Sequence, residues 1–206
     1  MFTYLPLVAI IAIGLLIAAR VISLARRGVR AIVVRKQPSL AAQAFEAAAF
    51  ALLVFWVYLL AAYADGRGPG WLPAWLNEQL FDATALKLLG AAMLVAGVAT
   101  FALAIHAMGA SFRMGIEEES SGGQPGRSSA PLVTDGVFAR SRNPIYLAFD
   151  LVALGSVLVH GRVIVVLAAA ALAAAFHVQI LREERFLAAM HGEAFAEYRR
   201  RVRRYV

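Results

Sequence analysis

The sequence predicts an all-α integral membrane protein with about five transmembrane helices and a C-terminal cytoplasmic amphipathic helix. Of its 206 residues, 61% are hydrophobic and only 16% are charged, and its mean hydropathy is +0.70. Soluble domains contain roughly 45–50% apolar residues, so this composition argues against a water-soluble enzyme. The apolar residues form long runs without strand-like alternation, and a helix satisfies all its own backbone polar groups inside lipid.

Five apolar runs are the predicted spans, and they cover residues 5–19, 41–64, 86–108, 145–159 and 163–181. A hydrocarbon core of ~30 Å requires about 20 helical residues, so the second, third and fifth runs cross it comfortably. The first and fourth runs are short and must recruit flanking residues. The first has no Lys or Arg before it and is expected to be a retained span rather than a secretion signal. Three residues separate the last two runs, which predicts a tight antiparallel hairpin.

The basic residues predict how these spans are oriented. Seventeen of the 20 Lys and Arg lie after spans one, three and five, whereas Arg67 and Arg162 lie on the other side. Because positive loops stay in the cytoplasm, we expect a protein of the cell (inner) membrane. Its N-terminus should lie outside the cell, and its C-terminus and active site should face the cytoplasm. The net charge of +7 fits this topology better than nucleic-acid binding, since no basic face is interleaved with aromatic residues.

The residue types present limit the possible chemistry. Cysteine is absent, which excludes disulfides, thiolate nucleophiles and iron–sulfur clusters. The four histidines are scattered without the spacing of a metal motif, so no metal is expected.

We expect two regions along the chain. Residues 1–108 contain the first three spans, and residues 109–206 contain a loop, the hairpin over 145–181 and a charged helix over 182–205. Residues 117–130 are rich in Ser, Gly and acidic residues and are predicted to form a mobile loop. In the last helix, apolar residues recur near a period of 3.6, so one face packs on protein or on the membrane surface.

Ionisable side chains inside spans are costly and are candidate functional residues. At 1.5 Å of rise per residue, four of them lie within about 8 Å of the cytoplasmic ends of four different spans. They are Glu46, His106, Asp150 and His177. This common depth predicts a polar substrate pocket that is reached from the cytoplasm and lies beneath an apolar chamber. The alternative is that each is only an interfacial residue. Lys87 lies at the outer end, where it can snorkel.

Two short stretches contain the residues most able to do chemistry. Arg142 lies just before span four, where it and the free amide groups of a helix start attract an anion such as a carboxylate. Pro144 fits the first helical turn because it has no amide hydrogen to leave unpaired. Glu183 and Glu184 leave span five, where they could receive an ammonium group, ribose hydroxyls or a proton. Ordinary solvated helix charge is the alternative for these glutamates.

These stretches resemble the isoprenylcysteine carboxyl methyltransferase and phospholipid methyltransferase family. Its pattern runs L-V-T-x-G-x-Y, R-H-P-x-Y, a hydrophobic hairpin, E-E, and G-E-x-Y-x-x-Y, and the resemblance covers residues 109–202. It implies a membrane-embedded helical protein that binds S-adenosylmethionine in a pocket reached from the cytoplasm. It also implies a lipophilic acceptor that enters from the bilayer, such as a prenylcysteine-like carboxylate, a phospholipid amine or another isoprenoid or lipid.

Carried over position by position, the resemblance implies two sets of site residues. The catalytic set is Arg142, Asn143, Glu183 and Glu184. The cofactor-binding set is Gly136, Arg142, Asn143, Pro144, Tyr146, Glu183, Glu184, Tyr198 and Arg199. Four positions depart from the pattern: Asn143 replaces the usual histidine, Phe138 and Phe195 replace tyrosines, and Ala148 stands where glycine is frequent. Asparagine can hydrogen-bond a carboxylate or an adenine but cannot carry a proton.

Two other functions remain as alternatives. An NADPH-dependent sterol-type reductase is similar in its C-terminal membrane region, but Ile145, Ala148 and Phe149 replace three residues typical of that family. A non-catalytic membrane scaffold or small transporter is the second alternative, although these spans lack the broken and repeated helices frequent in transporters. The methyl acceptor and the oligomeric state are not determined by the sequence.

Overall fold

The computed structural model describes residues 2–28, 39–109 and 132–206. Its helices are α1 (Leu5–Arg26), α2 (Leu40–Ala64), α3 (Thr84–Ala107), α4 (Pro144–His160) and α5 (Val163–Arg201), with 3-10 turns at Phe2–Tyr4, Ala74–Leu76 and Gly136–Ala139. These described residues contain no strand, and their one isolated bridge joins Gln79 to Arg162. The predicted all-α class is therefore confirmed. The loop predicted at 117–130 lies outside the described residues.

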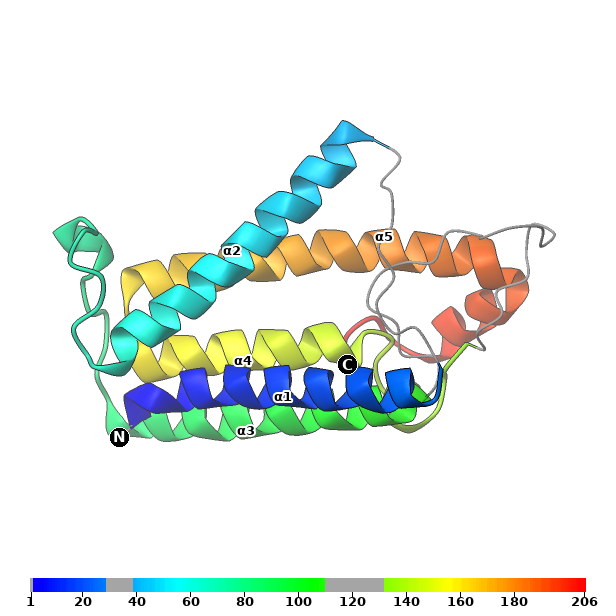
Figure 1. Ribbon diagram of the computed structural model, residues 1–206, viewed down its shortest axis with the longest axis horizontal. Coiled ribbons are helices and arrows are strands. Elements are labelled where there is room, and N and C mark those ends of the chain that lie inside the picture. The colour runs from blue at the N-terminus through cyan, green and yellow to red at the C-terminus, as the bar shows by residue number, and fades with distance from the viewer. Residues whose placement is uncertain (1, 29–38, 110–131) are drawn as a thin grey trace.

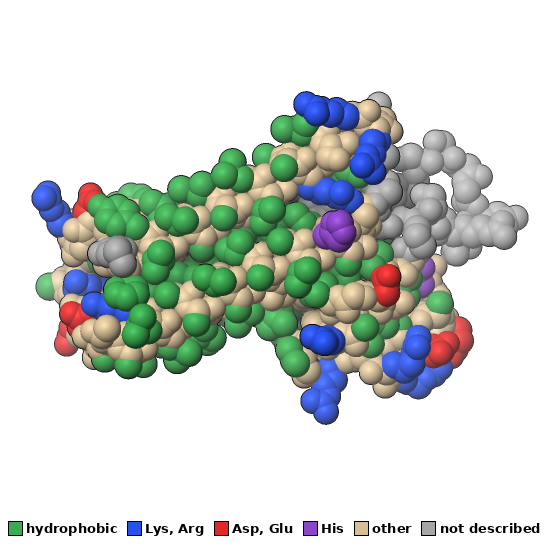
Figure 2. All heavy atoms as spheres, turned by 90° about the horizontal axis from the view of Figure 1, so that it is seen from below, with side chains coloured by type: hydrophobic (Ala, Val, Ile, Leu, Met, Phe, Trp, Pro, Cys, Tyr) green, Lys and Arg blue, Asp and Glu red, His purple; other side chains and the backbone are tan. Residues whose placement is uncertain are grey.

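The helices have the length and composition of membrane spans. Helices α1, α2, α3 and α5 are long and apolar enough to cross a bilayer, and α4 is a shorter apolar helix. Apolar side chains cover the middle of the molecule, while charged side chains gather at its two ends (Figure 2). The first span is longer than its apolar run predicted: α1 has 22 residues, or about 33 Å, because no helix breaker follows residue 19 and arginine stems can reach the interface.

Helices α3 and α4 lie side by side and pack closely through glycines (Figure 1). A Cβ atom added to Gly155 would lie 2.8 Å from the carbonyl oxygen of Gly90, and one added to Gly97 would lie 2.9 Å from that of Ala148. Small residues at such contacts allow two backbones in a membrane to approach each other. Because α3 precedes residue 108 and α4 follows it, this contact joins the two predicted regions of the chain. The division of the chain at residue 108 stays a prediction.

The core lies between α1, α3, α4, the first half of α5 and the last turns of α2. Trp56, Leu59 and Leu60 of α2 and Phe101 of α3 are almost fully buried. The first half of α2 leans away from α1 and α4 (Figure 1), and its Phe50 is 68% exposed. In a bilayer, this part of α2 therefore presents its apolar side chains to lipid.

The turn between α4 and α5 is as tight as predicted and is anchored from outside the hairpin. Gly161 ends α4 with a φ of +60°, a conformation that favours glycine. The amide of Leu80 donates to the carbonyl of Gly161 at 2.7 Å, and the amide of Val163 donates to the carbonyl of Glu78 at 3.1 Å. The connection between α2 and α3 therefore fixes one end of the hairpin.

Helix α5 differs from the prediction at its distal end. The helix expected over 182–205 is the continuation of α5, because Leu, Arg and Glu around residue 182 are good helix formers and no breaker precedes Gly192. Gly192 has a φ of +52° and kinks the helix, which then ends at Arg201. The last residues, 202–206, are not helical; we call them the tail. The tail returns to the start of α4 (Figure 1).

Candidate active site at the start of α4

An ion pair joins the start of α4 to α5. Arg142 donates from Nε and Nη2 to Oε1 of Glu184, at 3.1 and 2.9 Å. The two side chains are only 8% and 7% exposed. Pro144 begins α4 and so places Arg142 at the end of the hairpin, level with the residue of α5 that follows its span. The predicted meeting of the two ends is therefore present.

Arg204 of the tail binds the other side of the same carboxylate. Its Nη2 donates to Oε2 of Glu184 at 2.8 Å, and its Nε lies 3.2 Å from both oxygens. Burial alone would raise the pKa of Glu184, but the hydrogen bonds from Arg204 and Arg142 outweigh it and hold that pKa below its usual range. Glu184 is thus a buried carboxylate held ionised between two guanidinium groups.

The backbone of the tail is held by the residues that precede α4. The amide of Arg142 donates to the carbonyl of Arg203 at 3.0 Å, and its Nη1 donates to the carbonyls of Arg199 and Val202. Ser141 Oγ donates to the carbonyl of Arg204 at 3.3 Å. Four of the five N–H groups of the Arg142 side chain therefore donate within the protein.

Asn143, which replaces the usual histidine, is built into this network. It is 7% exposed, and its Nδ2 donates at 3.2 Å both to Oε1 of Glu184 and to the carbonyl of Arg204. A side-chain amide has two hydrogens on one nitrogen, which suits these two acceptors. A single imidazole nitrogen has at most one hydrogen and could not make both bonds.

Glu183 takes part in a second, separate contact with α4. Tyr146 donates its hydroxyl to Oε1 of Glu183 at 2.5 Å. Burial raises the pKa of Glu183, and the hydrogen bonds from Tyr146 and Gln179 only partly oppose that effect. The ring of Tyr146 lies 5.7 Å from that of Phe176. The two neighbouring glutamates therefore have different environments, one ionised between cations and the other shifted toward its neutral form.

Tyr198 of the closing motif and the adjacent Arg199 bind the end of α5 to the residues before α4. Tyr198 is buried and donates its hydroxyl to the carbonyl of Phe138 at 2.7 Å, and burial raises its pKa to about 12. Phe138 belongs to the 3-10 turn that begins at Gly136, whose φ is +59°. Arg199 is exposed and contributes its carbonyl rather than its side chain. These predicted site residues thus brace the network from the loop before α4.

Of the four residues of the predicted substrate pocket, Asp150 and His177 interact with each other, whereas Glu46 and His106 lie on two other helices. Asp150 interacts electrostatically with His177 and Tyr205, and His177 Nδ1 shares a 2.7 Å hydrogen bond with the hydroxyl of Tyr205. Oδ1 of Asp150 is buried and has no hydrogen-bond partner among the described residues. Glu46 is half-buried on α2, and His106 is exposed on α3.

Sequence reasoning missed three residues of this site: Ser141, Arg204 and Tyr205. Arg204 was counted only as one of many basic residues that indicate topology, and Tyr205 only as part of a helix. The sole local signal was that R-R-Y at 203–205 follows shortly after the closing motif, with four residues between it and Tyr198.

The lowered pKa of Glu184 predicts a pH dependence of stability. A carboxylate whose pKa is lowered by folding stabilises the protein above its unfolded pKa, about 4.3, and that contribution is lost as the pH falls further. We expect the melting temperature in detergent to fall steeply below about pH 4.3 in the wild type. The Glu184→Gln variant should lack this part of the fall. Parallel curves for the two proteins from pH 7 to pH 3.5 would contradict the assignment.

Comparison with known proteins gives one match. The family model described as phospholipid methyltransferase matches residues 86–194, which is just over half of the chain and includes α3, α4, Glu183 and Glu184. No curated protein and no solved structure matches the chain significantly. The match covers Arg142 and both glutamates but ends before Tyr198 and the tail, and because it spans more than half of the chain, the chain belongs to the phospholipid methyltransferase family.

Proposed function

We propose that the protein transfers a methyl group from S-adenosylmethionine to a lipophilic acceptor. The observation that carries this proposal is the convergence of the start of α4 and the tail on Glu184 of α5, next to Glu183, at one end of apolar helices. The family to which the chain belongs is one of methyltransferases. S-adenosylmethionine, when bound, supplies a methyl group on a positively charged sulfur, together with a carboxylate, an ammonium group, ribose hydroxyls and an adenine.

The residues at the site suit such a molecule. Asp150 has a buried oxygen that no described residue hydrogen-bonds, and a buried acceptor of this kind fits an ammonium or hydroxyl donor. Glu183 lies on the next helix and has one oxygen bound to Tyr146, a residue one helical turn before Asp150 on α4. We assign to these two carboxylates the binding of the donor groups of the cofactor. The ring of Phe176, whose centroid is 5.7 Å from that of Tyr146 and 5.5 Å from that of Phe149, forms with them an aromatic cluster that excludes water on the membrane side.

Arg142 and Arg204 have a different role in this proposal. Because Arg142 has one side-chain N–H group left after its bonds to Glu184 and two carbonyls, it acts chiefly by holding Glu184 and the tail in place. The predicted bond from Arg142 to a cofactor carboxylate would use that last group. Methyl transfer requires alignment of donor and acceptor more than acid–base chemistry, and a rigid ion cluster supplies it.

The acceptor is proposed to be a lipid that approaches from the bilayer. A carboxylate acceptor needs no base, whereas an amine or hydroxyl needs one, and Asp150, His177 and Glu183 are the nearest candidates. The segments that follow spans one, three and five, at this end of the molecule, have an excess of Lys and Arg, which supports a cytoplasmic site.

Cofactor choice tests this proposal directly. We expect saturating S-adenosylmethionine, and not NADPH, to raise the melting temperature of the purified protein, because a ligand at 100 times its Kd stabilises the folded state by about 2.7 kcal/mol. Labelled methyl groups from the same cofactor should appear in a total lipid extract. Glu183→Gln should weaken cofactor binding, whereas Glu193→Gln, on the exposed part of α5, should not.

The alternatives give different results in the same experiment. Stabilisation by NADPH alone would indicate a reductase. Stabilisation by neither cofactor, with no labelled lipid, would indicate a scaffold or a transporter.

A further inference from the structure

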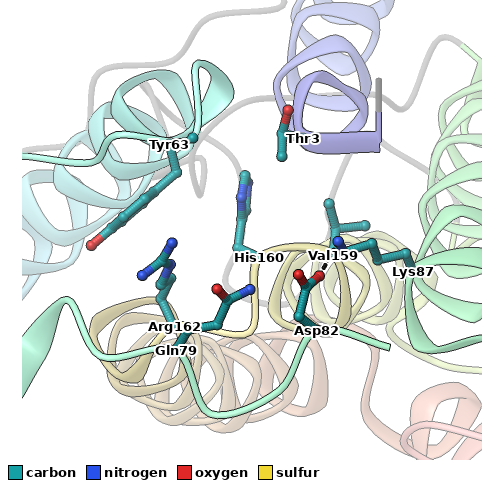
Figure 3. A pocket seen from close by; sticks show the side chains of 9 residues that line it. Thr3, Tyr63, Gln79, Asp82, Lys87, Val159, His160 and Arg162 are labelled. Atoms are coloured by element: carbon teal, nitrogen blue, oxygen red, sulfur yellow. Dashed lines mark ion pairs between the residues drawn. The ribbon is translucent and has the colours of Figure 1, made fainter. Parts of the chain in front are cut away.

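A polar cavity lies at the end of the helices opposite to Glu184, where α4 turns into α5. It has a volume of about 200 Å³ and is formed by the ends of α2 and α4, the first turn of α3 and the connection between α2 and α3 (Figure 3). Its polar lining consists of Thr3, Gln79, Asp82, Lys87, His160 and Arg162. None of these residues belongs to the site around Glu184, so the cavity is separate from that site.

His160 points into this cavity with an unused nitrogen (Figure 3). The residue is only 5% exposed, and its Nε2 is buried without a hydrogen-bond partner among the described residues. Its ring packs against that of Tyr63, with centroids 5.8 Å apart, which fixes the direction of the imidazole. Nearly all buried polar groups in proteins have a partner, so an unpaired nitrogen on a residue that lines a cavity points to a ligand.

The charges around the cavity favour an anion. Lys87 forms an ion pair with Asp82, so these two charges balance. Arg162 donates to the carbonyl of Asn77 at 2.7 Å and lies over the ring of Tyr63 at 5.7 Å. Within the described part of the chain, Arg162 has no acidic partner. One positive charge at this cavity is therefore uncompensated.

We propose that this cavity binds a phosphate group, with Arg162 as the countercharge and His160 Nε2 as a hydrogen-bond donor. A guanidinium group matches the geometry of phosphate oxygens, and Nε2 donates when it carries the ring proton. The cavity lies at the end of apolar helices, and the connection between α2 and α3 that lines part of it also contains the exposed Trp71 and Trp75, a residue type typical of the headgroup level. The phosphate comes either from a phospholipid headgroup or from solution.

Two probes distinguish these sources. Protein in phosphate-free detergent is titrated with short-chain phosphatidylglycerol, and bound lipid is counted by native mass spectrometry. In parallel, inorganic phosphate is titrated and the melting temperature is recorded. The variants are Arg162→Gln, which removes the charge, and His160→Phe, which keeps a ring against Tyr63 but removes the nitrogen. Arg67→Gln is the control, because Arg67 is exposed at the same end and outside the cavity.

We expect each cavity variant to bind roughly tenfold more weakly than the wild type, as for the loss of one hydrogen bond to a charged group, and the control to bind normally. An effect on the lipid alone identifies a headgroup, and an effect on inorganic phosphate identifies a soluble ligand. If Arg162→Gln does not fold, His160→Phe decides. Equal binding by the wild type and the folded cavity variants, or no binding of either probe, would overturn the proposal. Neither outcome depends on methyl transfer.

Discussion

Replacement of Glu184 by glutamine should abolish most of the activity and much of the stability of the protein. The change leaves Arg142 and Arg204 facing a neutral amide, and removing one partner of a buried ion pair costs about 3–5 kcal/mol. Part of this cost is relieved because the Arg204 side chain is 35% exposed and solvent screens its charge. The tail also loses its anchor, and since misplacement by 1 Å can cost about 100-fold in rate, methyl transfer should fall by about that factor.

The measurements are the melting temperature in detergent and the transfer of labelled methyl groups into lipid. Glu193→Gln is the matched control, because its ion pair with Arg200 joins side chains that are 82% and 64% exposed. Such surface pairs contribute about 0–1 kcal/mol. If both variants behaved alike, the ion cluster around Glu184 would not hold the site together.

Replacement of Gly155 by leucine should prevent α3 and α4 from packing. A Cβ atom at this position already lies 2.8 Å from the carbonyl oxygen of Gly90 and 2.9 Å from Cγ of Leu94. The rest of a leucine side chain would force the two helices apart, which costs at least about 1–3 kcal/mol. We expect a large loss of folded protein, measured as the monodisperse fraction in detergent and as a lower melting temperature.

Gly14→Leu provides the control for this prediction. Gly14 also lies inside an apolar helix, but nothing is within 4 Å of the Cβ atom that it would acquire. Leucine is a better helix former than glycine by about 0.8 kcal/mol, so this variant should be as stable as the wild type or slightly more stable. A Gly155→Leu protein that melts with the wild type would show that α3 and α4 do not pack through these glycines.

The spans could be predicted from the sequence because hydrophobicity and helix propensity are properties of neighbouring residues. The limits of α2 and α3 therefore agree closely with their apolar runs. The end of α5 could not be predicted in the same way. Arg and Glu favour a helix whether or not it has left the membrane. Gly192 kinks α5, and the helix ends at Arg201, where the bonds that hold the tail begin.

The candidate site was predicted in part for a similar reason. The meeting of Arg142 with Glu184 follows from an antiparallel hairpin, since each residue lies just beyond the same end of its predicted span. The contribution of Arg204 depends on a reversal of the chain that no periodic pattern records. The assignment of Asn143, Glu183 and Asp150 to catalysis or binding rests on their position in the network and stays a prediction.

Helix α5 is uninterrupted from Val163 to Gly192, so it is a rigid rod between the two surfaces of the membrane. Glu184 lies about 33 Å along this helix from the turn that joins it to α4. Helices change their tilt to match the thickness of the hydrocarbon layer, and a rotation of α5 about that turn displaces Glu184 relative to α4. The lipid that surrounds the protein is thereby also a mechanical influence on the alignment of its site.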